Sequence, residues 1–373
     1  MGKWIAAVLA AVMLFCEGTG PALAAEAAKP AEAPKVPTRI VINLASRFLS
    51  LYVNGVKTAM YPIGAGKLAT PTPLGNYKII EKEENPTWVD PKDSKKKVES
   101  GEDNPLGYRW MRFVDDYGIH GTNKPESVGS YVSNGCIRLR EADVEQLYQA
   151  VSMGTPVEVR YDRVVIEKLA DDTVVYYIYP DGYSWQPLTI AKVNQMLAGY
   201  GVAAFESDAA ISDKLLASDG QPTYVAKSFA IEVNGLWISG KAVESEGVLY
   251  LPAQPLARVL KLKLDWNADT GLLTTPYGSV PGVLKKNTLF LDAQDMEKLF
   301  QVTGALDARQ VLVLTSEKAA AAPAVPAAVP EAPAAAAAQA AGIAEPAAAP
   351  VGAATNVKAN PQQPATAKAA AQH

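Results

Sequence analysis

Alternating apolar and polar positions predict β structure in the first ordered part of the chain. Between residues 39 and 66 the alternation runs on both sides of Asn54-Gly55, the residue pair that tight hairpin turns favour. A Pro-limited turn and a further strand follow in "ATPTPLGNYKIIEKE", and "YRWMRFVDDYGIH" predicts one strand that ends at His120. We therefore expect a β-hairpin and at least two more strands before residue 121.

The apolar period then changes to that of a helix. In "READVEQLYQAVSMG" apolar residues recur at helical spacing and a glycine is expected to stop the helix (Val144, Leu147, Tyr148, Val151 and Gly154). "TPVEVRYD" returns to the alternation of a strand. Residues 38–162 are thus predicted to form a mostly β domain with one clear helix.

The pattern after residue 162 is weaker. A hairpin is expected around residues 170–172, and "LTIAKVNQMLAGYG" predicts a helix that Gly199 ends. Residues 203–222 are irregular and polar enough to be a linker. We interpret residues 163–222 as an extension of the first domain or as a spacer.

A second domain is predicted at residues 223–317. It contains a hairpin with another Asn-Gly turn, a helix from about Pro255 to Leu260 and a strand with the turn "WNADTG", which together indicate a small α+β accessory domain. Its aromatic residues Trp237, Tyr250 and Trp266 could stack on sugars, but packing in a core is the more common fate of such side chains, by roughly three to one.

The two ends of the chain have the composition of processing and tail segments. Residues 1–24 combine a lysine, a short apolar run and the small-x-small sequence Ala22-Leu23-Ala24, which is typical of a secretory signal peptide. A retained membrane anchor is the weaker alternative, since the run is shorter than the ~20 residues that a span needs. Residues 25–37 are an Ala/Pro/Lys/Glu linker, and residues 318–373 are an Ala/Pro-rich tail expected to be disordered.

Composition narrows the classes of function. The chain has 373 residues, room for two or three domains, and a net charge of −4, which gives no reason to expect nucleic-acid binding. It has two histidines and two cysteines, and Cys16 belongs to the predicted signal peptide. One internal histidine and one cysteine make a zinc site of the usual type improbable.

The remaining cysteine, Cys136, is the strongest chemical signal. A lone thiol in an exported protein is exposed to oxidation, and Cys136 follows the turn sequence Ser133-Asn134-Gly135 at the start of a predicted half-buried strand. His120, with an ordinary imidazole pKa near 6.5, is suited to take the thiol proton or to form a thiolate–imidazolium pair. From residue types alone, such a site and a structural histidine with a buried thiol are about equally well supported.

Several motifs occur together in a familiar order. "HGT" at His120, "SNGCIRL" around Cys136, "TPTPLGNYKI", "NPTWV" and "NPLGYRWM" resemble the signature of the YkuD-type L,D-transpeptidases, which remodel bacterial peptidoglycan. The resemblance covers about residues 38–162 and implies a YkuD-like β-sandwich with a helix. Residues 223–317 resemble the copper amine oxidase N-terminal-like domain, although this segment contains neither His nor Cys as copper ligands.

The first resemblance implies roles for individual residues. Cys136 is expected to be the acylated nucleophile and His120 the base, steered by the carbonyl of Gly121. The backbone around the cysteine could form an oxyanion hole, and the orienting residues are expected to be Gly121, Ser133, Asn134 and Gly135. Arg138 is expected to bind substrate, although a single arginine is also an ordinary surface charge.

The resemblance implies a ping-pong reaction that needs no metal and no cofactor. The thiol would attack a stem tetrapeptide and release D-alanine, and an amine of a neighbouring stem would resolve the thioester into a 3→3 cross-link. The expected partners are peptidoglycan stem peptides and the cell wall, with carbapenem β-lactams as trapping inhibitors. We expect an exported protein of the cell wall, or of the periplasm where an outer membrane exists, with no membrane span once the signal is cleaved.

Asn134 departs from the family pattern, because many members have His before the Gly-Cys pair. Asn cannot titrate, so any acid/base role at that position is lost. Because His120 supplies the base, we expect activity to survive, and the change puts acceptor preference or inhibitor susceptibility in question. Two alternatives stay open: an L,D-carboxypeptidase that uses water as the acceptor, and a non-catalytic wall-binding protein on the same fold.

Overall fold

The computed structural model describes residues 37–316. The predicted signal peptide with Cys16, residues 25–36 of the predicted linker and the predicted tail from residue 318 lie outside the described residues. One hydrophobic cluster is built mainly from residues 40–161, and two further clusters from residues 164–243 and 229–314. We call residues 37–162 the first part and residues 163–316 the second part.

The first part begins with a five-stranded sheet. Its order is β3-β2-β1-β13-β5, where β1 is Thr38–Asn43, β2 is Phe48–Val53, β3 is Val56–Pro62, β5 is Gly75–Lys78 and β13 is Pro156–Arg160. The predicted hairpin is confirmed: Asn54 (φ 52°) and Gly55 (φ 78°) form the two-residue turn between β2 and β3. Two successive positive φ angles are what a turn of this kind requires.

A four-stranded sheet faces the first. Its order is β12-β10-β9-β6, where β6 is Glu81–Glu84, β9 is Arg109–Val114, β10 is Tyr117–His120 and β12 is Ile137–Arg138. The prediction of a single strand over residues 108–120 is wrong, because the chain reverses at Asp115-Asp116 and β9 pairs with β10. Asp115 adopts φ 40°, a left-handed conformation that Asp tolerates better than most residues. Two shorter pairs complete the part: β4 (Ala65–Gly66) with β11 (Tyr131–Ser133), and β7 (Trp88–Asp90) with β8 (Asp93–Val98).

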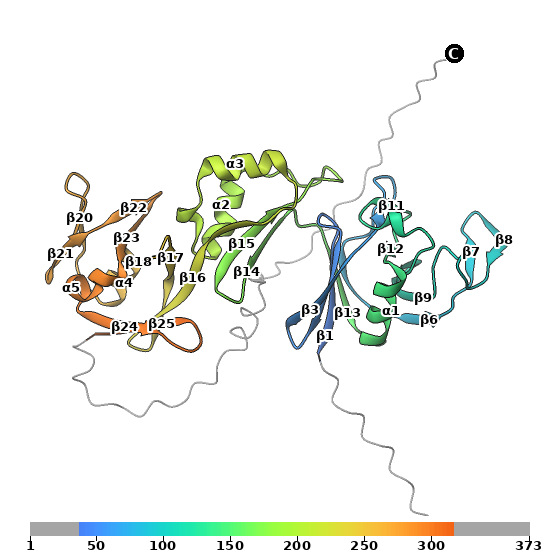
Figure 1. Ribbon diagram of the computed structural model, residues 1–373, viewed down its shortest axis with the longest axis horizontal. Coiled ribbons are helices and arrows are strands. Elements are labelled where there is room, and N and C mark those ends of the chain that lie inside the picture. Colours follow the sequence, from blue (N-terminus) through green and yellow to red (C-terminus); the bar gives the residue numbers. More distant parts are fainter. Residues whose placement is uncertain (1–36, 317–373) are drawn as a thin grey trace, which may run out of the picture. The chain divides into compact units, whose positions relative to one another are not determined.

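The two sheets and the helix α1 (Glu141–Ala150) enclose one core, which confirms a mostly β domain with one clear helix. Each element buries alternate or helically spaced apolar residues, among them Ile40, Ile42, Met111, Ile119, Ile137, Val144 and Leu147. The helix lies beside β9 (Figure 1). Its last turn has no basic residue of its own, and Lys82 of β6 donates instead to the carbonyls of Tyr148 and Val151, both at 2.6 Å. A cation at this end complements the helix dipole.

The second part is built on one large sheet. Its strands follow the order β14-β15-β16-β17-β18-β23-β22, with β25 joining β16 and β24. Their bounds are β14 Val164–Lys168, β15 Thr173–Ile178, β16 Thr223–Val233, β17 Leu236–Ser245, β18 Val248–Pro252, β22 Val283–Lys285, β23 Thr288–Asp292, β24 Val302–Leu306 and β25 Val311–Ser316. Because β15 pairs with β16, the segment predicted as an extension or spacer supplies two strands to the same sheet as residues 223–316.

The helices of the second part pack beside this sheet and a smaller one. They are α2 (Ile190–Gly199), α3 (Asp208–Ala217), α4 (Ala253–Val259) and α5 (Met296–Phe300), and the smaller sheet joins β19 (Asp265–Asn267), β20 (Leu272–Thr275) and β21 (Gly278–Pro281). The expectation of an irregular linker at residues 203–222 is wrong, because this segment contains α3. The side chain of Ser207 accepts from the backbone N–H of Ala210, a regular N-cap that the polar composition obscured.

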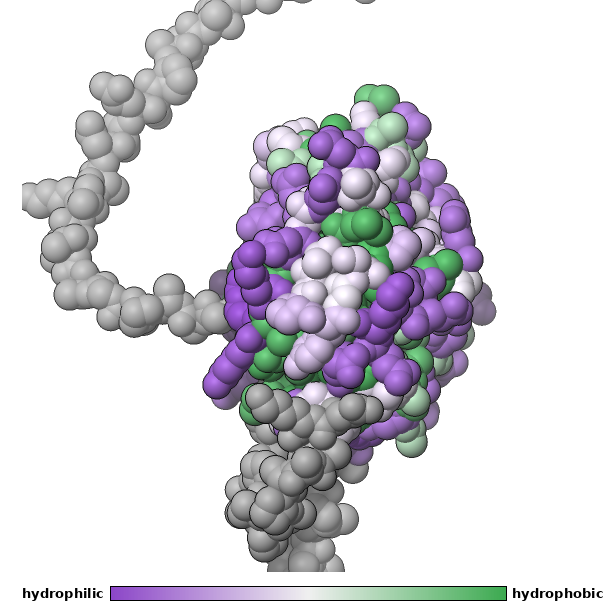
Figure 2. Space-filling model, turned by 90° about the vertical axis from the view of Figure 1, so that its left-hand side faces the viewer, coloured by the Kyte–Doolittle hydropathy of each residue, from purple (hydrophilic) through white to green (hydrophobic). Residues whose placement is uncertain are grey.

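The aromatic residues of the second part have different environments. Trp237 is 60% exposed at the β16–β17 hairpin. The ring centroid of Tyr250 lies 5.3 Å from that of Phe205, and Trp266 packs against the hydrophobic core. On the face of the second part that Figure 2 shows, hydrophobic residues occur as separate small patches among hydrophilic ones. Among residues 37–316, no helix combines the length and the apolar character that crossing a membrane demands.

A short segment after β15 packs onto the first part. Tyr183 is buried in the core of the first part, its ring centroid lies 4.6 Å from that of Tyr131, and its hydroxyl donates to the carbonyl of Gly66. Asp181 accepts from the hydroxyl of Tyr161 at 2.7 Å. Gly66 belongs to β4, which pairs with β11, the strand that precedes the turn before Cys136. Through this hydrogen bond the segment after β15 supports that turn.

Candidate active site

The register of the second sheet brings the predicted site residues together. β10 and β12 run parallel, with His120 paired to Arg138 and Ile119 paired to Ile137. Because side chains alternate across a strand, His120 and Arg138 share one face, and Ile119 and Ile137 point into the core on the other. Cys136 comes immediately before β12, and the charge of Arg138 acts on both Cys136 and His120. Residues that the sequence separates by a polar loop therefore meet on adjacent strands.

The turn before the cysteine is held by its own serine. The hydroxyl of Ser133 donates to the carbonyl of Cys136 at 2.6 Å and accepts from the backbone N–H of Gly135 at 3.0 Å. The N–H of Gly135 is thus already bonded, which leaves the N–H of Cys136 as the donor to consider for an oxyanion. Asn134 is exposed at the tip of the turn, where its amide can reach solvent or a ligand.

Thr72, which the sequence reasoning did not single out, braces the same turn. Its hydroxyl is fully buried, donates to the carbonyl of Gly135 at 2.7 Å and accepts from the N–H of Gly66 at 3.1 Å. Thr72 belongs to the motif "TPTPLGNYKI", but the motif alone does not indicate which residues Thr72 contacts. Its contacts explain why a distant Pro/Thr segment accompanies the cysteine turn.

Gly135 occupies a position that no other residue fits without strain. Its φ is +125°, and a Cβ there would lie 2.1 Å from a carbon of the Tyr117 ring. We expect Gly135→Ala to lower the rate of Cys136 acylation by about 10²-fold, since a displacement near 1 Å at a reacting group has that effect. Gly129→Ala is the matched control, because Gly129 has φ +92° and nothing within 4 Å. Equal losses in both variants, measured by carbapenem adduct formation, would contradict a specific role for the turn.

His120 is buried and neutral in this setting. Its side chain is 4% exposed, and Nδ1 donates to the carbonyl of Gly121 at 2.6 Å, so Nε2 is the nitrogen left to accept a proton. Burial lowers the pKa of His120 to about 4, the bond to Gly121 acts in the opposite direction, and the nearby Arg138 charge lowers the pKa further. The ring of Trp110, the cross-strand neighbour, lies 5.7 Å from the imidazole centroid.

The thiol of Cys136 is also in its neutral form. Burial raises the pKa of Cys136 above its ordinary value, while a hydrogen bond from the Gly118 backbone and the charge of Arg138 act in the opposite direction. The thiol donates to the carbonyl of Asp116 at 3.7 Å. A raised thiol pKa beside a lowered imidazole pKa favours a neutral pair at rest, with proton transfer during attack, over a standing thiolate–imidazolium pair.

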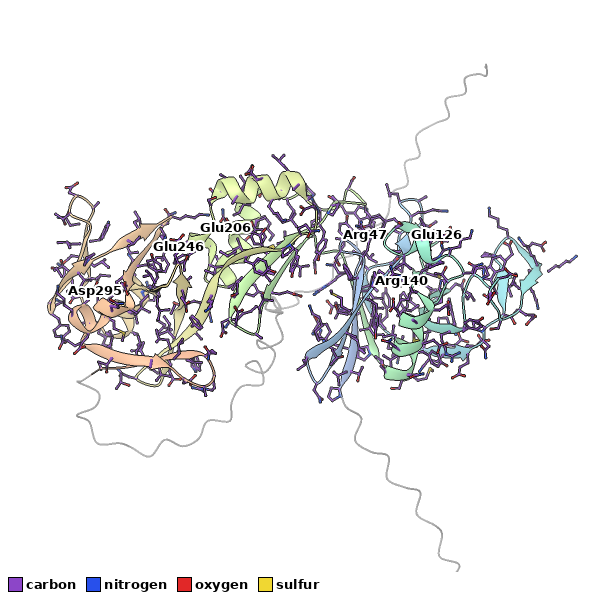
Figure 3. All side chains as sticks on the ribbon, in the orientation of Figure 1. Arg47, Glu126, Arg140, Glu206, Glu246 and Asp295 are labelled. Carbon is purple, nitrogen blue, oxygen red and sulfur yellow. The ribbon has the colours of Figure 1, made fainter. Side chains whose placement is uncertain are left out.

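Arg138 supplies the positive charge of the site. Its guanidinium is half-buried; burial lowers the pKa of Arg138, and Cys136 and Glu126 act in the opposite direction. Figure 3 shows Glu126, from the short helix η1 (Pro125–Ser127), and Arg140 at the end of the first part that holds β11 and β12. A guanidinium that is only partly buried can still pair with a substrate carboxylate.

The described residues around the site do not form a metal-binding cluster. Within residues 37–316 no group of three or more His, Cys, Asp and Glu side chains has the spacing to hold a metal ion. The site offers a thiol at the start of β12, with a base and a cation on the adjacent strands. These are the groups that acyl transfer by a cysteine nucleophile requires.

Comparison with known proteins agrees with this fold, which is that of a mostly β, YkuD-like domain. Residues 37–159 match the family model YkuD, the L,D-transpeptidase catalytic domain. A putative L,D-transpeptidase, YqjB of Bacillus subtilis, is 38% identical over 138 residues, which is 35% of this chain and 76% of the relative. The chain therefore belongs to the YkuD family of L,D-transpeptidases.

Other relatives are similar over smaller shares. The probable L,D-transpeptidase ErfK/SrfK of Escherichia coli K12 is 33% identical over 159 residues, which is 39% of this chain and 48% of the relative. Among solved structures, an L,D-transpeptidase from Mycobacterium smegmatis is 22% identical with a TM-score of 0.29, over 34% of this chain and 59% of that one. L,D-transpeptidase 3 from Mycobacterium tuberculosis, in complex with a faropenem-derived adduct, is 21% identical with a TM-score of 0.29 over 34% of this chain and 60% of that one. The chain thus spans about half to three fifths of these three proteins.

Proposed function

We propose that this protein is an exported cysteine L,D-transpeptidase that acylates itself with a peptidoglycan stem tetrapeptide and transfers the acyl group to form 3→3 cross-links. The observation that carries the proposal is the pairing of β10 with β12, which sets His120 beside Arg138, with Cys136 immediately before β12. Membership of the YkuD family supports the same chemistry.

The first half-reaction forms the acyl-enzyme. Nε2 of His120 takes the thiol proton while the sulfur of Cys136 attacks the carbonyl between the third residue of the stem and its terminal D-alanine. The C–N bond then breaks, the proton passes from His120 to the leaving amine, and D-alanine departs. The positive charge of Arg138 would hold a carboxylate of the stem, and the N–H of Cys136 would donate to the oxyanion.

The second half-reaction regenerates the enzyme. The amine of another stem attacks the thioester, His120 takes a proton from that amine, and the C–S bond breaks. The thiolate recovers the proton, so the cycle needs no external reductant, oxidant or cofactor. Water in place of the amine would give a tripeptide, which is the carboxypeptidase alternative.

The test is product analysis with the purified protein and a stem tetrapeptide, alone and with an excess of an acceptor stem. We expect release of D-alanine and a cross-linked dimer by liquid chromatography and mass spectrometry. Tripeptide as the sole product would assign the carboxypeptidase activity, and an intact tetrapeptide under all conditions would favour the non-catalytic wall-binding alternative.

The remaining assignments belong to the same proposal. Residues 1–24 would export the protein to the cell wall or periplasm, and residues 223–317 would form a copper amine oxidase N-terminal-like domain with a binding or spacing role. The exposed Trp237 is the residue of that domain best placed to contact a wall polymer, since Tyr250 and Trp266 pack against other side chains. A β-lactam carbapenem, which acylates thiols, would compete with the stem peptide for Cys136.

A further inference from the structure

The first residue of α1 makes contacts that helix capping does not require. Glu141 reaches away from its helix, and its Oε1 accepts from the backbone N–H of Thr122 at 2.6 Å. Its Oε2 accepts from the backbone N–H of Tyr108 at 3.2 Å. The carboxylate therefore joins the segment that follows His120 to the segment that precedes β9.

The space around this carboxylate is shaped for it. Gly107, with φ +66°, and Gly121 flank it closely. A Cβ on Gly107 would lie 1.8 Å from Oε1 of Glu141, and a Cβ on Gly121 would lie 2.0 Å from it. Two glycines at one carboxylate allow the backbone to approach it from both sides, and any larger residue at either position would displace it.

The bond to Thr122 leads directly to the candidate base. The N–H of Thr122 and the carbonyl of Gly121 belong to one planar peptide unit. The N–H of that unit donates to Glu141, and its carbonyl accepts from Nδ1 of His120 at 2.6 Å. A carboxylate on the N–H side fixes the orientation of the plane and polarises its carbonyl, which becomes a stronger acceptor for the imidazole.

We infer that Glu141 is a positioning residue for His120, acting through the Gly121–Thr122 peptide in a carboxylate–peptide–imidazole relay. The inference rests on the proposed function, because it assigns the relay to the base of that reaction. The relay holds the proton on Nδ1 and keeps Nε2 free to accept the proton of Cys136. The two hydrogen bonds of Glu141 go to the backbone of Tyr108 and Thr122, so its effect on the imidazole passes through the peptide.

A purely structural carboxylate at the start of a helix is the competing explanation. Acidic residues in the first turn stabilise the helix dipole wherever they point. Glu145 provides the matched control, because it lies one turn further along α1, carries the same charge and forms an ion pair with Arg109 at 3.0 Å. We find no bond from Glu145 to the Gly121–Thr122 peptide among the described contacts.

The experiment is nitrogen-15 NMR of the imidazoles in the histidine-labelled whole protein. The chain has only two histidines, so His120 is assigned by comparison with a His373→Ala background. In the unmodified protein we expect the signals of a single tautomer with the proton on Nδ1. In Glu141→Ala the Nδ1 and Nε2 signals should move toward each other as the tautomers mix, and carbapenem acylation of Cys136 should slow by about 10- to 100-fold. Glu145→Ala should leave the His120 signals in place.

Glu141→Gln covers the case in which the alanine variant does not fold. A neutral amide fills the same space but polarises the peptide less than a carboxylate, so an intermediate shift of the His120 signals is expected. The inference would be overturned if the His120 signals of folded Glu141→Ala superimposed on those of the unmodified protein. If Glu141→Ala does not fold, the same outcome for Glu141→Gln decides. The NMR measurement does not depend on turnover. A protein without transpeptidase activity would therefore refute the proposed function, while the His120 signals would still decide the role of Glu141.

Discussion

Cys136→Ala should form no covalent adduct with a carbapenem and should release no D-alanine from a stem tetrapeptide. In the proposed mechanism the sulfur is the atom that bonds to the substrate carbonyl, and alanine has no atom to replace it. Removing the nucleophile of a serine catalytic triad lowers turnover by roughly 10⁶-fold, and a comparable loss here would bring the rate to the limit of detection. Intact-mass spectrometry of the two proteins after identical incubation is the measurement.

The design separates a missing nucleophile from a damaged fold. Cys136→Ser keeps the shape of the side chain and the bonds of the turn, but an uncharged hydroxyl is a much weaker nucleophile than a thiol. We expect it to bind the stem with little change and to acylate very slowly. An adduct of full yield on Cys136→Ala would move the nucleophile to another residue and contradict the site proposed above.

The elements that could be predicted from sequence are those whose signal is local. The β2–β3 hairpin follows from Asn54-Gly55 and the strands beside it, and α1 follows from the spacing of its apolar residues. The reversal at Asp115-Asp116 was missed because no glycine or proline marks it. A left-handed Asp115 supplies the turn, and only the pairing of β9 with β10 reveals it.

The helix α3 was missed for a different reason. Its sequence "DAAISDKLLA" has apolar residues, but they do not gather on one face of the helix and only Ile211 is buried, so the periodic signal is weak. The N-cap Ser207 was available as a signal, but a serine in a polar stretch is equally typical of a loop.

Some residues of the candidate site could likewise be identified from the sequence, and others only from their contacts in the structure. His120 and Cys136 stood out because the chain contains so few of either residue, and the motif gave them roles. Thr72 and Glu141 act through contacts with residues 135 and 122, which lie far from them or across a turn, and no local pattern announces such bonds. The lowered pKa of His120 is likewise a product of burial, which residue types do not disclose.

That pKa gives the second large prediction, which concerns His120→Gln. The imidazole loses its proton at a pH of about 4, so above that value its neutral form, the base, is present. The acylation rate of the unmodified protein should therefore fall on the acid side with a midpoint near 4 and stay nearly level from pH 5 to pH 8. Loss of a positioned base lowers such rates by 10²- to 10⁴-fold, and we expect roughly 10³-fold at pH 7 for His120→Gln.

The shape of the pH profile distinguishes this mechanism from a standing ion pair. Without a base, attack requires the free thiolate, so the rate of His120→Gln should rise steadily with pH toward the raised pKa of Cys136. The gap between the two proteins should narrow accordingly at high pH. Initial rates of carbapenem adduct formation from pH 3.5 to pH 9 measure both profiles, with His373→Gln as the control for removal of a histidine. A midpoint near 6.5 in the unmodified protein would mean that the imidazole is not desolvated, and the neutral resting pair would have to be abandoned.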